Sequence, residues 1–274
     1  MSAISQDDLH RLQKTILEIA TYFDAFCKSH DISYYLMGGT ALGAMRHGGF
    51  IPWDDDYDVF MDAENYKKFF DAASDSLDED RFYLQRENTE EWPLFFSKLR
   101  LNDTIFLESD TAGRDMHHGI YIDIMCLNHA FSSKPLRYLQ YFTARVLSTM
   151  ALARRGYETT SPVKRLAMTI ARAADIKPLR SLLLKFVRSR NQSESKMIGH
   201  FFGRAPFHAT SFPKTYLGEA RYVPFETEHL PVPSNVEAYL ARRFGSDFMK
   251  PPSQQIRDQY PSHAVKVDFG PYQP

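Results

Sequence analysis

The stretch "YYLMGGTALGAMRHGGFIPWDDDYDVFM", residues 34–61, carries most of what the sequence says about the fold. It places two glycines after an apolar run and ends with four aspartates within five residues. Neighbouring carboxylates repel one another and raise one another's pKa, so such a cluster costs stability unless a cation lies among them. The stretch therefore predicts a cation-binding site close to a glycine turn.

The residues around the aspartates predict a strand, a short helix and a second strand. The apolar runs 32–37 and 57–61 are typical of strands, and the segment 38–47 between them is expected to be helical. Alternate side chains of a strand share a face, which puts Asp56 and Asp58 on the same side. Two carboxylates on one face can bind Mg²⁺ or Mn²⁺, with water and substrate phosphate oxygens completing the coordination shell.

The glycine turn is a candidate phosphate-binding element. Gly38 and Gly39 lack Cβ atoms, so backbone N–H groups at the helix start can approach a phosphate, and Thr40 offers a hydroxyl. Arg46 and His47 leave this helix near the turn. They either contact substrate or interact with the carboxyl end of the helix.

Two further predicted strands carry charged residues. In 119–127, Asp123 lies between apolar neighbours, an expensive place for an unpaired charge, and it is the third candidate acid. Lys98 and Arg100 share one face of 94–101, where they would neutralise donor phosphates unless that face is simply exposed to solvent. Together with the glycine turn, these residues indicate metal-assisted phosphoryl or nucleotidyl transfer.

Two other interpretations of the acidic cluster stay open. Asp54, Asp56 and Asp58 occupy positions 1, 3 and 5 of a calcium-binding EF-hand loop, but Val59 stands at position 6 in place of Gly and Asn65 at position 12 in place of Glu. The cluster could also be a solvated acidic surface without a ligand. The apolar residues that flank it argue against that surface.

Charge and periodicity divide the rest of the chain. Residues 1–130 hold 11 Lys and Arg against 24 Asp and Glu, residues 131–196 hold 14 against 3, and residues 197–274 hold 8 against 7. The middle part reads as about three basic amphipathic helices. We expect an α/β (α+β) fold, with a catalytic core of 1–130 plus 197–274 and an inserted basic helical subdomain, 131–196. The basic part indicates an anionic partner, or else balances its acidic neighbour within the molecule.

Local signals also fix the first and last long helices. Ser5 caps a helix that is expected to end near His30, and Ser234 with Glu237 forms a capping box for a helix that stops at Gly245. The tail beyond that helix is expected to be irregular.

The cysteines and the terminus indicate a compartment. Cys27 and Cys126 lie far apart in sequence, so no disulfide framework is expected and a reducing compartment is favoured. The N-terminal segment contains Asp7 and Asp8 where a signal peptide needs basic residues, and no stretch approaches 18 apolar residues. We expect a cytoplasmic protein whose basic segment 131–196 contacts the anionic inner face of the membrane, with no nucleic-acid partner.

At residues 37–61 the chain resembles the LicD family, the fukutin-like group within the nucleotidyltransferase-like superfamily. "MGGTALGAMRHGGFIPWDDDYDVFM" is similar, nearly position for position, to that family's G-T-x-L-G-x-x-R-H-x-G-F-I-P-W-D-D-D-I-D signature. The segments 98–108, 119–128 and 222–252 are similar to it as well. The departures are Tyr57 in place of Ile, and F-G-S-D at 244–247 in place of Y-G-D.

The resemblance implies a nucleotidyltransferase-like mixed-sheet palm core and a LicD-type phosphotransferase of surface-polysaccharide biosynthesis, such as that of lipopolysaccharide or capsule. It implies transfer of a phosphorylated alcohol, typically phosphorylcholine from CDP-choline, to a hydroxyl of a cell-surface glycan or a lipid-linked oligosaccharide. Asp56 and Asp58 would be the metal-binding pair and Asp123 a third acid, serving as metal ligand or as base. Gly39 and Thr40 would contact the donor phosphates. Transfer of NMP to a small acceptor, and a catalytically silent member that binds a glycan or a partner, are the alternatives.

Overall fold

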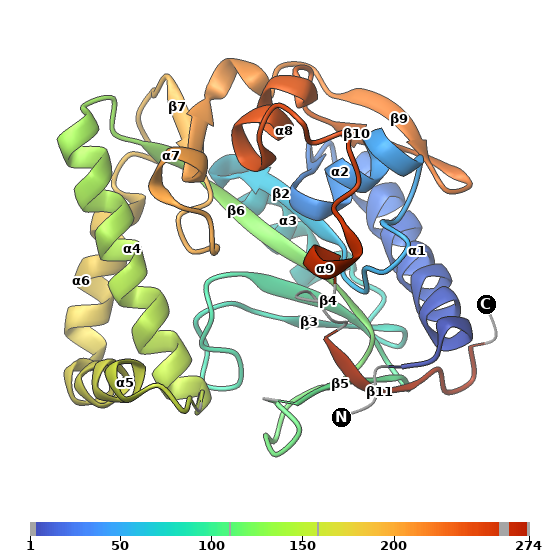
Figure 1. The fold of residues 1–274 in the computed structure, drawn as a ribbon, viewed down its shortest axis with the longest axis horizontal. Coiled ribbons are helices and arrows are strands. Elements are labelled where there is room, and N and C mark those ends of the chain that lie inside the picture. Colours follow the sequence, from blue (N-terminus) through green and yellow to red (C-terminus); the bar gives the residue numbers. More distant parts are fainter. Residues whose placement is uncertain (1–3, 110, 158, 258–262, 273–274) are drawn as a thin grey trace.

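The computed structural model describes residues 4–109, 111–157, 159–257 and 263–272. Its centre is a sheet in the order β1-β2-β6-β4-β3, in which β2 and β6 run parallel and the other neighbours antiparallel (Figure 1). β7 continues the sheet from the far end of β6, and β8 pairs with β7. The bounds are β1 (Tyr35–Leu36), β2 (Asp58–Asp62), β3 (Phe82–Gln85), β4 (Ser97–Leu101), β6 (Tyr121–Ala130), β7 (Met197–Gly199) and β8 (Ser211–Pro213). The expected α/β (α+β) class, a mixed sheet flanked by helices, is confirmed.

One face of this sheet is covered by α1 (Gln6–Ser29) and α3 (Ala63–Ser76). The two helices meet where Phe23 contacts Phe69, with ring centroids 5.3 Å apart. Helix α1 starts as predicted, because the Ser5 hydroxyl accepts the Asp8 N–H at 3.0 Å. Its helical spacing brings a continuous apolar stripe against the sheet: Leu9, Leu12, Ile16, Ile19 and Phe23. The opposite face of the sheet is therefore the one left for the site.

Helix α2 (Gly38–His47) begins at the glycine turn and ends at Gly48, a left-handed residue with φ 71°. It packs closely on the loop that leads to the aspartates. A Cβ added to Gly43 would lie 2.4 Å from the Gly49 carbonyl oxygen, so no larger residue fits there without moving the backbone. The preceding strand is shorter than predicted, since only Tyr35–Leu36 of residues 32–37 pair with β2.

Three basic helices form the side of the molecule at the left of Figure 1, as the periodicity predicts: α4 (Lys134–Arg155), α5 (Pro162–Ala174) and α6 (Lys177–Arg188). They enclose a second cluster of buried apolar residues, separate from the cluster around the central sheet. Three of their arginines pair with acidic residues near the sheet: Arg154 with Glu90 at 2.9 Å, Arg155 with Glu108 at 2.8 Å and Arg188 with Glu87 at 2.6 Å. Part of the basic charge thus balances acidic charge within the molecule.

The C-terminal part corrects two predictions. Helix α8 (Val236–Phe244) stops at Gly245 as expected, but Asn235 caps its start by accepting the Ala238 N–H at 3.2 Å. The predicted capping box at Ser234 is wrong by one residue, because the Ser234 hydroxyl instead donates to the Tyr216 carbonyl at 3.4 Å.

The prediction of an irregular tail is also wrong for its described part. β11 (Ala264–Asp268) pairs with β5 (Ile105–Glu108), a contact between distant segments that no local pattern indicates. The Pro-rich segment before α8 forms the hairpin β9 (Arg221–Phe225) and β10 (Glu228–Val232). The short elements α7 (Phe207–Thr210), η1 (Lys214–Tyr216) and α9 (Gln254–Arg257) complete the described fold.

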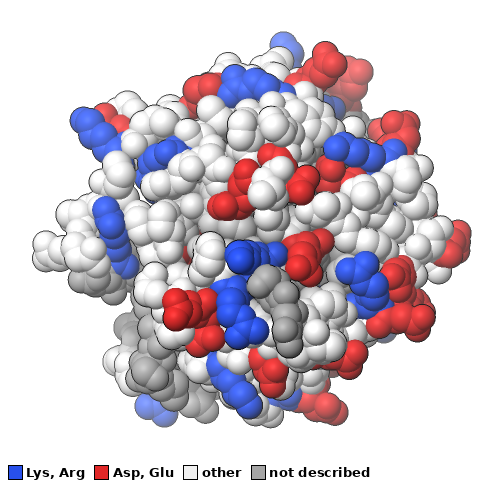
Figure 2. Space-filling view, turned by 90° about the vertical axis from the view of Figure 1, so that its right-hand side faces the viewer, with Lys and Arg blue, Asp and Glu red and all other residues white. Residues whose placement is uncertain are grey.

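The surface on the α1 side carries charged residues of both signs. Figure 2 views the side at the right of Figure 1, where Lys and Arg lie interspersed with Asp and Glu. Within the described residues, no helix is both long and apolar enough to cross a bilayer.

Candidate active site

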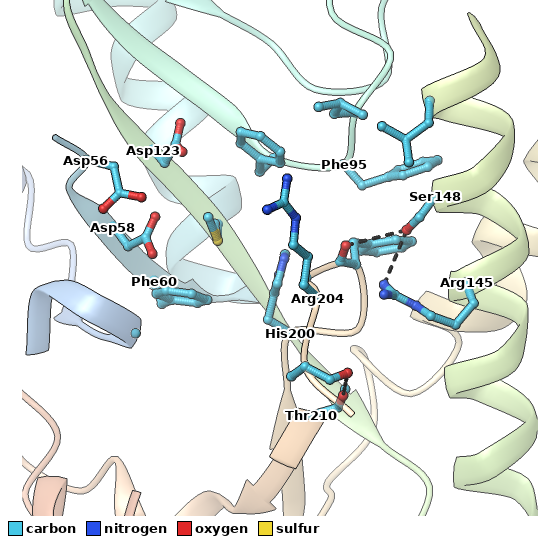
Figure 3. Close-up of a pocket in the computed structure, with 18 of the residues that line it drawn as sticks. Asp56, Asp58, Phe60, Phe95, Asp123, Arg145, Ser148, His200, Arg204 and Thr210 are labelled. Atoms are coloured by element: carbon cyan, nitrogen blue, oxygen red, sulfur yellow. Dashed lines mark hydrogen bonds between the residues drawn. The ribbon is translucent and has the colours of Figure 1, made fainter. Parts of the chain in front are cut away.

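The sheet register lays three of the predicted residues in one row. Asp58 of β2 lies opposite Asp123 of β6, and Asp123 lies opposite Lys98 of β4. The backbone confirms the alignment, since the Asp123 N–H donates to the Tyr57 carbonyl at 2.8 Å. Asp56 precedes Asp58 by two residues and lines the same cleft. Figure 3 shows Asp56, Asp58 and Asp123 together at one end of that cleft.

The carboxylates of Asp56 and Asp58 are partly buried, yet no described group donates a hydrogen bond to either. Burial raises the pKa of Asp56 to about 6; the charge of His263 opposes this rise and that of Asp123 adds to it. Burial, and then repulsion from Asp56 and Asp123, raises the pKa of Asp58 well above its usual range. This end of the cleft therefore holds negative charge that the protein itself does not compensate.

Asp123 is held differently, by an ion pair with Lys98 at 2.8 Å. Lys98 is buried, with its ammonium 3.1 Å from the ring centroid of Tyr121 and 5.1 Å and 5.3 Å from those of Trp92 and Phe96. Burial lowers the pKa of Lys98 and the charge of Asp123 opposes that shift. The alternative in which Lys98 and Arg100 lie on an exposed strand face is wrong, because both are 2% exposed.

Glu108 links Tyr121, one of the rings around Lys98, to helix α4. Its carboxylate accepts the Tyr121 hydroxyl at 2.7 Å and pairs with Arg155 at 2.8 Å. Burial opposes ionisation of Glu108, but the charges of Lys98 and Arg155 hold its pKa at about 2. Tyr121, Trp92 and Phe96 form an aromatic box around Lys98. Glu108, which stays ionised at neutral pH, holds the Tyr121 ring of this box in place.

The glycine turn lies directly against the acidic cluster. A Cβ on Gly38, whose φ is +62°, would lie 3.0 Å from Oδ2 of Asp58, and a Cβ on Gly39 would lie 3.2 Å from Oδ2 of Asp54. Any larger side chain would fill the space beside these oxygens. Glycine at these two positions therefore lets the start of the helix approach the carboxylates closely.

The residues present fit a divalent cation held by two carboxylates. Among the described residues, no group of three or more His, Cys, Asp or Glu side chains is arranged to hold a metal ion. Asp123 is paired with Lys98. Asp56 and Asp58 remain, partly buried and without hydrogen-bond donors. Mg²⁺ uses one or two carboxylates together with water and substrate phosphate oxygens, which suits this pair.

Several predicted substrate-binding residues have partners within the fold. The Thr40 hydroxyl accepts the Asp58 N–H at 2.8 Å and so positions the start of β2. The Gly38 N–H donates to the Tyr239 hydroxyl at 3.0 Å. Arg100 donates to the Gln85 side chain at 2.9 Å and to the Gly119 carbonyl at 2.7 Å. The Gly38 N–H and the Arg100 guanidinium thus bond within the fold, while the Thr40 oxygen accepts from the backbone.

Arg46 and His47 lie at the end of α2 and bond to each other, Arg46 donating to His47 at 2.9 Å. Arg46 also donates to the Phe248 carbonyl at 3.2 Å.

Of the ten residues predicted for the site, five line the cleft: Gly38, Asp56, Asp58, Lys98 and Asp123. The other five lie outside its lining: Gly39, Thr40, Arg46, His47 and Arg100.

The cleft itself has a volume of about 900 Å³ and runs from the acidic cluster to helices α4 and α5. Its wall includes Arg145, His200, Arg204 and Arg243, none of which the sequence singled out. Figure 3 shows Arg204 and His200 between the aspartates and the Arg145 side chain of α4. They follow β7 or lie on helices far along the chain, so spacing gave no signal for them.

His200 is a neutral residue in this wall. Its Nδ1 lies 3.3 Å from the Cys126 carbonyl, which can only accept, so Nδ1 carries the proton and Nε2 is the acceptor. Burial lowers the pKa of His200 to about 4.

Asp55, which also belongs to the cluster of four aspartates, has a structural role. Asp55 accepts the Ala264 N–H at 2.9 Å and pairs with Nδ1 of His263 at 2.8 Å, which ties β11 to the cluster. The hydrogen bond to Asp55 raises the pKa of His263 to about 9. Within the cluster, Asp55 is thus a tertiary anchor, whereas Asp56 and Asp58 face the cleft.

The raised pKa of Asp56 has a measurable effect on stability. Because the folded form binds this proton more tightly than the unfolded chain, stability falls as pH rises from about 4 to about 6 and stays lower above that range. With a chelator present, Asp56→Asn should raise the free energy of unfolding at pH 8 by about 1–3 kcal/mol, and the gain should shrink towards pH 4. Urea unfolding at the two pH values measures it. A variant less stable than the parent at pH 8 would contradict the proposed cost of burying the Asp56 charge.

The glycine turn and the acidic cluster lie in a segment that is similar to known proteins. Residues 31–110 match the family described as "LicD/FKTN/FKRP, nucleotidyltransferase domain". The chain is 52% identical over 64 residues to lipopolysaccharide cholinephosphotransferase LicD of Haemophilus influenzae, a match that covers 23% of this chain and 24% of that protein. It is 31% identical over 80 residues to ribitol 5-phosphate transferase FKRP of Mus musculus and of Homo sapiens, covering 28% of this chain and 16% of each.

The matched region contains the glycine turn, the aspartates and Lys98, while Asp123 and the basic helices follow it in the chain. The chain thus spans a quarter or less of the length of each of these relatives. Within that span, the resemblance predicted from the sequence is confirmed: residues 31–110 match the LicD family.

Proposed function

We propose that this protein transfers a phosphorylated alcohol from a CDP-linked donor to a hydroxyl group of a cell-surface glycan, in a reaction that depends on Mg²⁺ or Mn²⁺. The observation that carries the proposal is the pair Asp56 and Asp58, which face the cleft beside the glycine turn without any compensating donor. The names of the relatives, a cholinephosphotransferase and a ribitol 5-phosphate transferase, support transfer of an alcohol phosphate. Choline is the first alcohol to test.

Asp56 and Asp58 would hold the metal, which when bound offsets the negative charge of the donor's pyrophosphate. The acceptor hydroxyl oxygen forms a bond to the phosphorus of the alcohol phosphate, while the bond from that phosphorus to CMP breaks and CMP leaves. Asp123 would accept the hydroxyl proton; if it instead served as a ligand of a second ion, water would accept that proton. Lys98 forms an ion pair with Asp123. Its ammonium group would also neutralise part of the negative charge of the donor phosphates.

The cleft volume of about 900 Å³ suits two substrates. Beyond the acidic cluster, the wall presents Arg145, Arg204 and Arg243, which together favour an anionic nucleotide or a phosphorylated acceptor. A glycan or a lipid-linked oligosaccharide is the acceptor class that this proposal implies.

Nucleotidyl transfer is the second candidate, because the same carboxylates can serve a reaction in which NMP moves and pyrophosphate leaves. Both reactions are tested by incubating the protein with Mg²⁺ and either CDP-choline, CDP-ribitol, CDP-glycerol or CDP-ethanolamine, or a nucleoside triphosphate, and following the products by phosphorus NMR. The proposal predicts release of CMP from one CDP-alcohol and none with EDTA.

Two results would count against it. Pyrophosphate release from a nucleoside triphosphate would favour nucleotidyl transfer. Absence of both donor cleavage and any metal-dependent rise in Tm with every donor would favour a silent glycan- or partner-binding member.

A further inference from the structure

Helix α5 presents its apolar side chains to solvent. Val163, Leu166 and Ile170 are 77%, 63% and 60% exposed, and their spacing places them in one stripe along the helix. In the whole helix only Ala171 is buried. Ile176, in the short connection to α6, is 58% exposed and Leu182 of α6 is 64% exposed. An amphipathic helix normally buries such a stripe, so this one lacks a partner among the described residues.

The same two helices are strongly basic. Residues 162–188 contain seven Lys and Arg and a single acid, Asp175. Asp175 is already bound, to Arg180 at 2.6 Å and to Arg154 at 3.4 Å. The remaining cations of the pair include Lys164, Arg165, Lys177 and Lys185, which form no ion pair with any described residue. The surface around the apolar stripe therefore keeps a net positive charge.

We propose that α5 and the α5–α6 corner bind the surface of an anionic lipid bilayer. Val163, Leu166, Ile170 and Ile176 would enter the boundary between head groups and acyl chains, with Arg165 and Lys177 on the anionic head groups. This contact is peripheral, because no described helix can cross a bilayer.

Charge and side-chain type favour this occupant over two others. A second copy of the chain docking through the same face would bring like charges together, which opposes a symmetric dimer. Nucleic acid would use the cations but gains little from aliphatic side chains, since its bases stack on aromatic residues. A bilayer uses both the positive charge and the aliphatic stripe.

The position of α5 connects this surface to the cleft. Lys164, Ala167 and Met168 of the same helix line the cleft, so one helix would lie on the bilayer and also form part of the cleft wall. An acceptor anchored in the membrane would then reach the cleft without leaving the bilayer. That last step rests on the proposed function, whereas the bilayer contact does not.

Sedimentation with vesicles tests the contact without any substrate, so its outcome is independent of the transfer reaction. The full chain should bind vesicles of phosphatidylcholine mixed with phosphatidylglycerol and bind poorly to phosphatidylcholine alone. Leu166→Ser with Ile170→Ser should lower the partition coefficient at least about tenfold, because two inserted aliphatic side chains are lost. Arg165→Gln with Lys177→Gln should lower it roughly tenfold on the anionic vesicles only.

Tyr222→Ser with Met249→Ser is the matched control, since both residues are 49% exposed and lie outside the basic helices. It should bind like the parent protein. An unchanged melting temperature in all three variants keeps misfolding out of the comparison. The proposal is overturned if the parent does not bind anionic vesicles, or if the α5 variants bind as well as the control.

Discussion

Asp58→Asn should lower the rate of metal-dependent donor cleavage at least about a thousandfold and leave the fold intact. The side chain makes no hydrogen bond within the described protein, so its amide replacement breaks no protein contact. What it removes is half of the carboxylate pair that faces the glycine turn. Burial and repulsion already raise the pKa of Asp58, and the neutral amide should therefore be tolerated, or even favoured, when no metal is bound.

The measurement is CMP release with saturating Mg²⁺, together with the melting temperature in EDTA. Asp71→Asn is a suitable control, because Asp71 is an exposed carboxylate on α3 whose partner is Lys67. It should cleave the donor like the parent. Near-normal turnover by Asp58→Asn would remove this residue from the reaction.

Lys98→Met should lower the free energy of unfolding by about 3–5 kcal/mol. The substitution keeps an unbranched side chain beside Tyr121, but it leaves Asp123 buried without its cation and Glu108 with Arg155 alone. A stability loss of that size corresponds to a fall in Tm of roughly 10 °C for a chain of this length.

The double variant Lys98→Met with Asp123→Asn separates charge from packing. If the cost of Lys98→Met is the unpaired Asp123, the neutral amide should recover a large part of it. Urea unfolding of the two single variants and the double variant gives the coupling energy. Equal stability of the Lys98→Met variant and the double variant would mean that the aromatic contacts, and not the ion pair, stabilise this strand.

The parts of the fold that could be predicted are those set by local signals. The Ser5 cap, the start of α2 at the glycines and the three basic helices follow from residues within a turn or two of one another. Pairing between distant strands does not. β2 pairs with β6 in parallel, and β11 pairs with β5 in an antiparallel ladder. Both pairings depend on tertiary packing that neighbouring residues do not encode.

The site divides in the same way. The alternation of a strand places Asp56 and Asp58 on one face, and the apolar neighbours of Asp123 mark it as unusual. The sequence could not say that Thr40 would accept the Asp58 N–H, because a hydroxyl takes whichever partner the fold brings to it. For the same reason, Arg100 was available to a phosphate in sequence terms but is engaged by Gln85 and Gly119 in the structure.

Other residues of the cleft gave no signal at all. His200, Arg204 and Arg243 reach the cleft only because β7 pairs with the end of β6 and α8 packs on α2. Single histidines and arginines in segments without a recognisable pattern are not distinguishable from surface residues before the chain is folded.

The most direct test of the central claim is Mn²⁺ binding followed by electron paramagnetic resonance, with and without CDP-choline. Parent protein should bind Mn²⁺, more tightly when the donor is present, and the variants Asp56→Asn and Asp58→Asn should each lose that binding while Asp71→Asn keeps it. Equal Mn²⁺ affinity in the parent and in both cleft variants would contradict the account, since the ion would then lie somewhere other than between these two carboxylates.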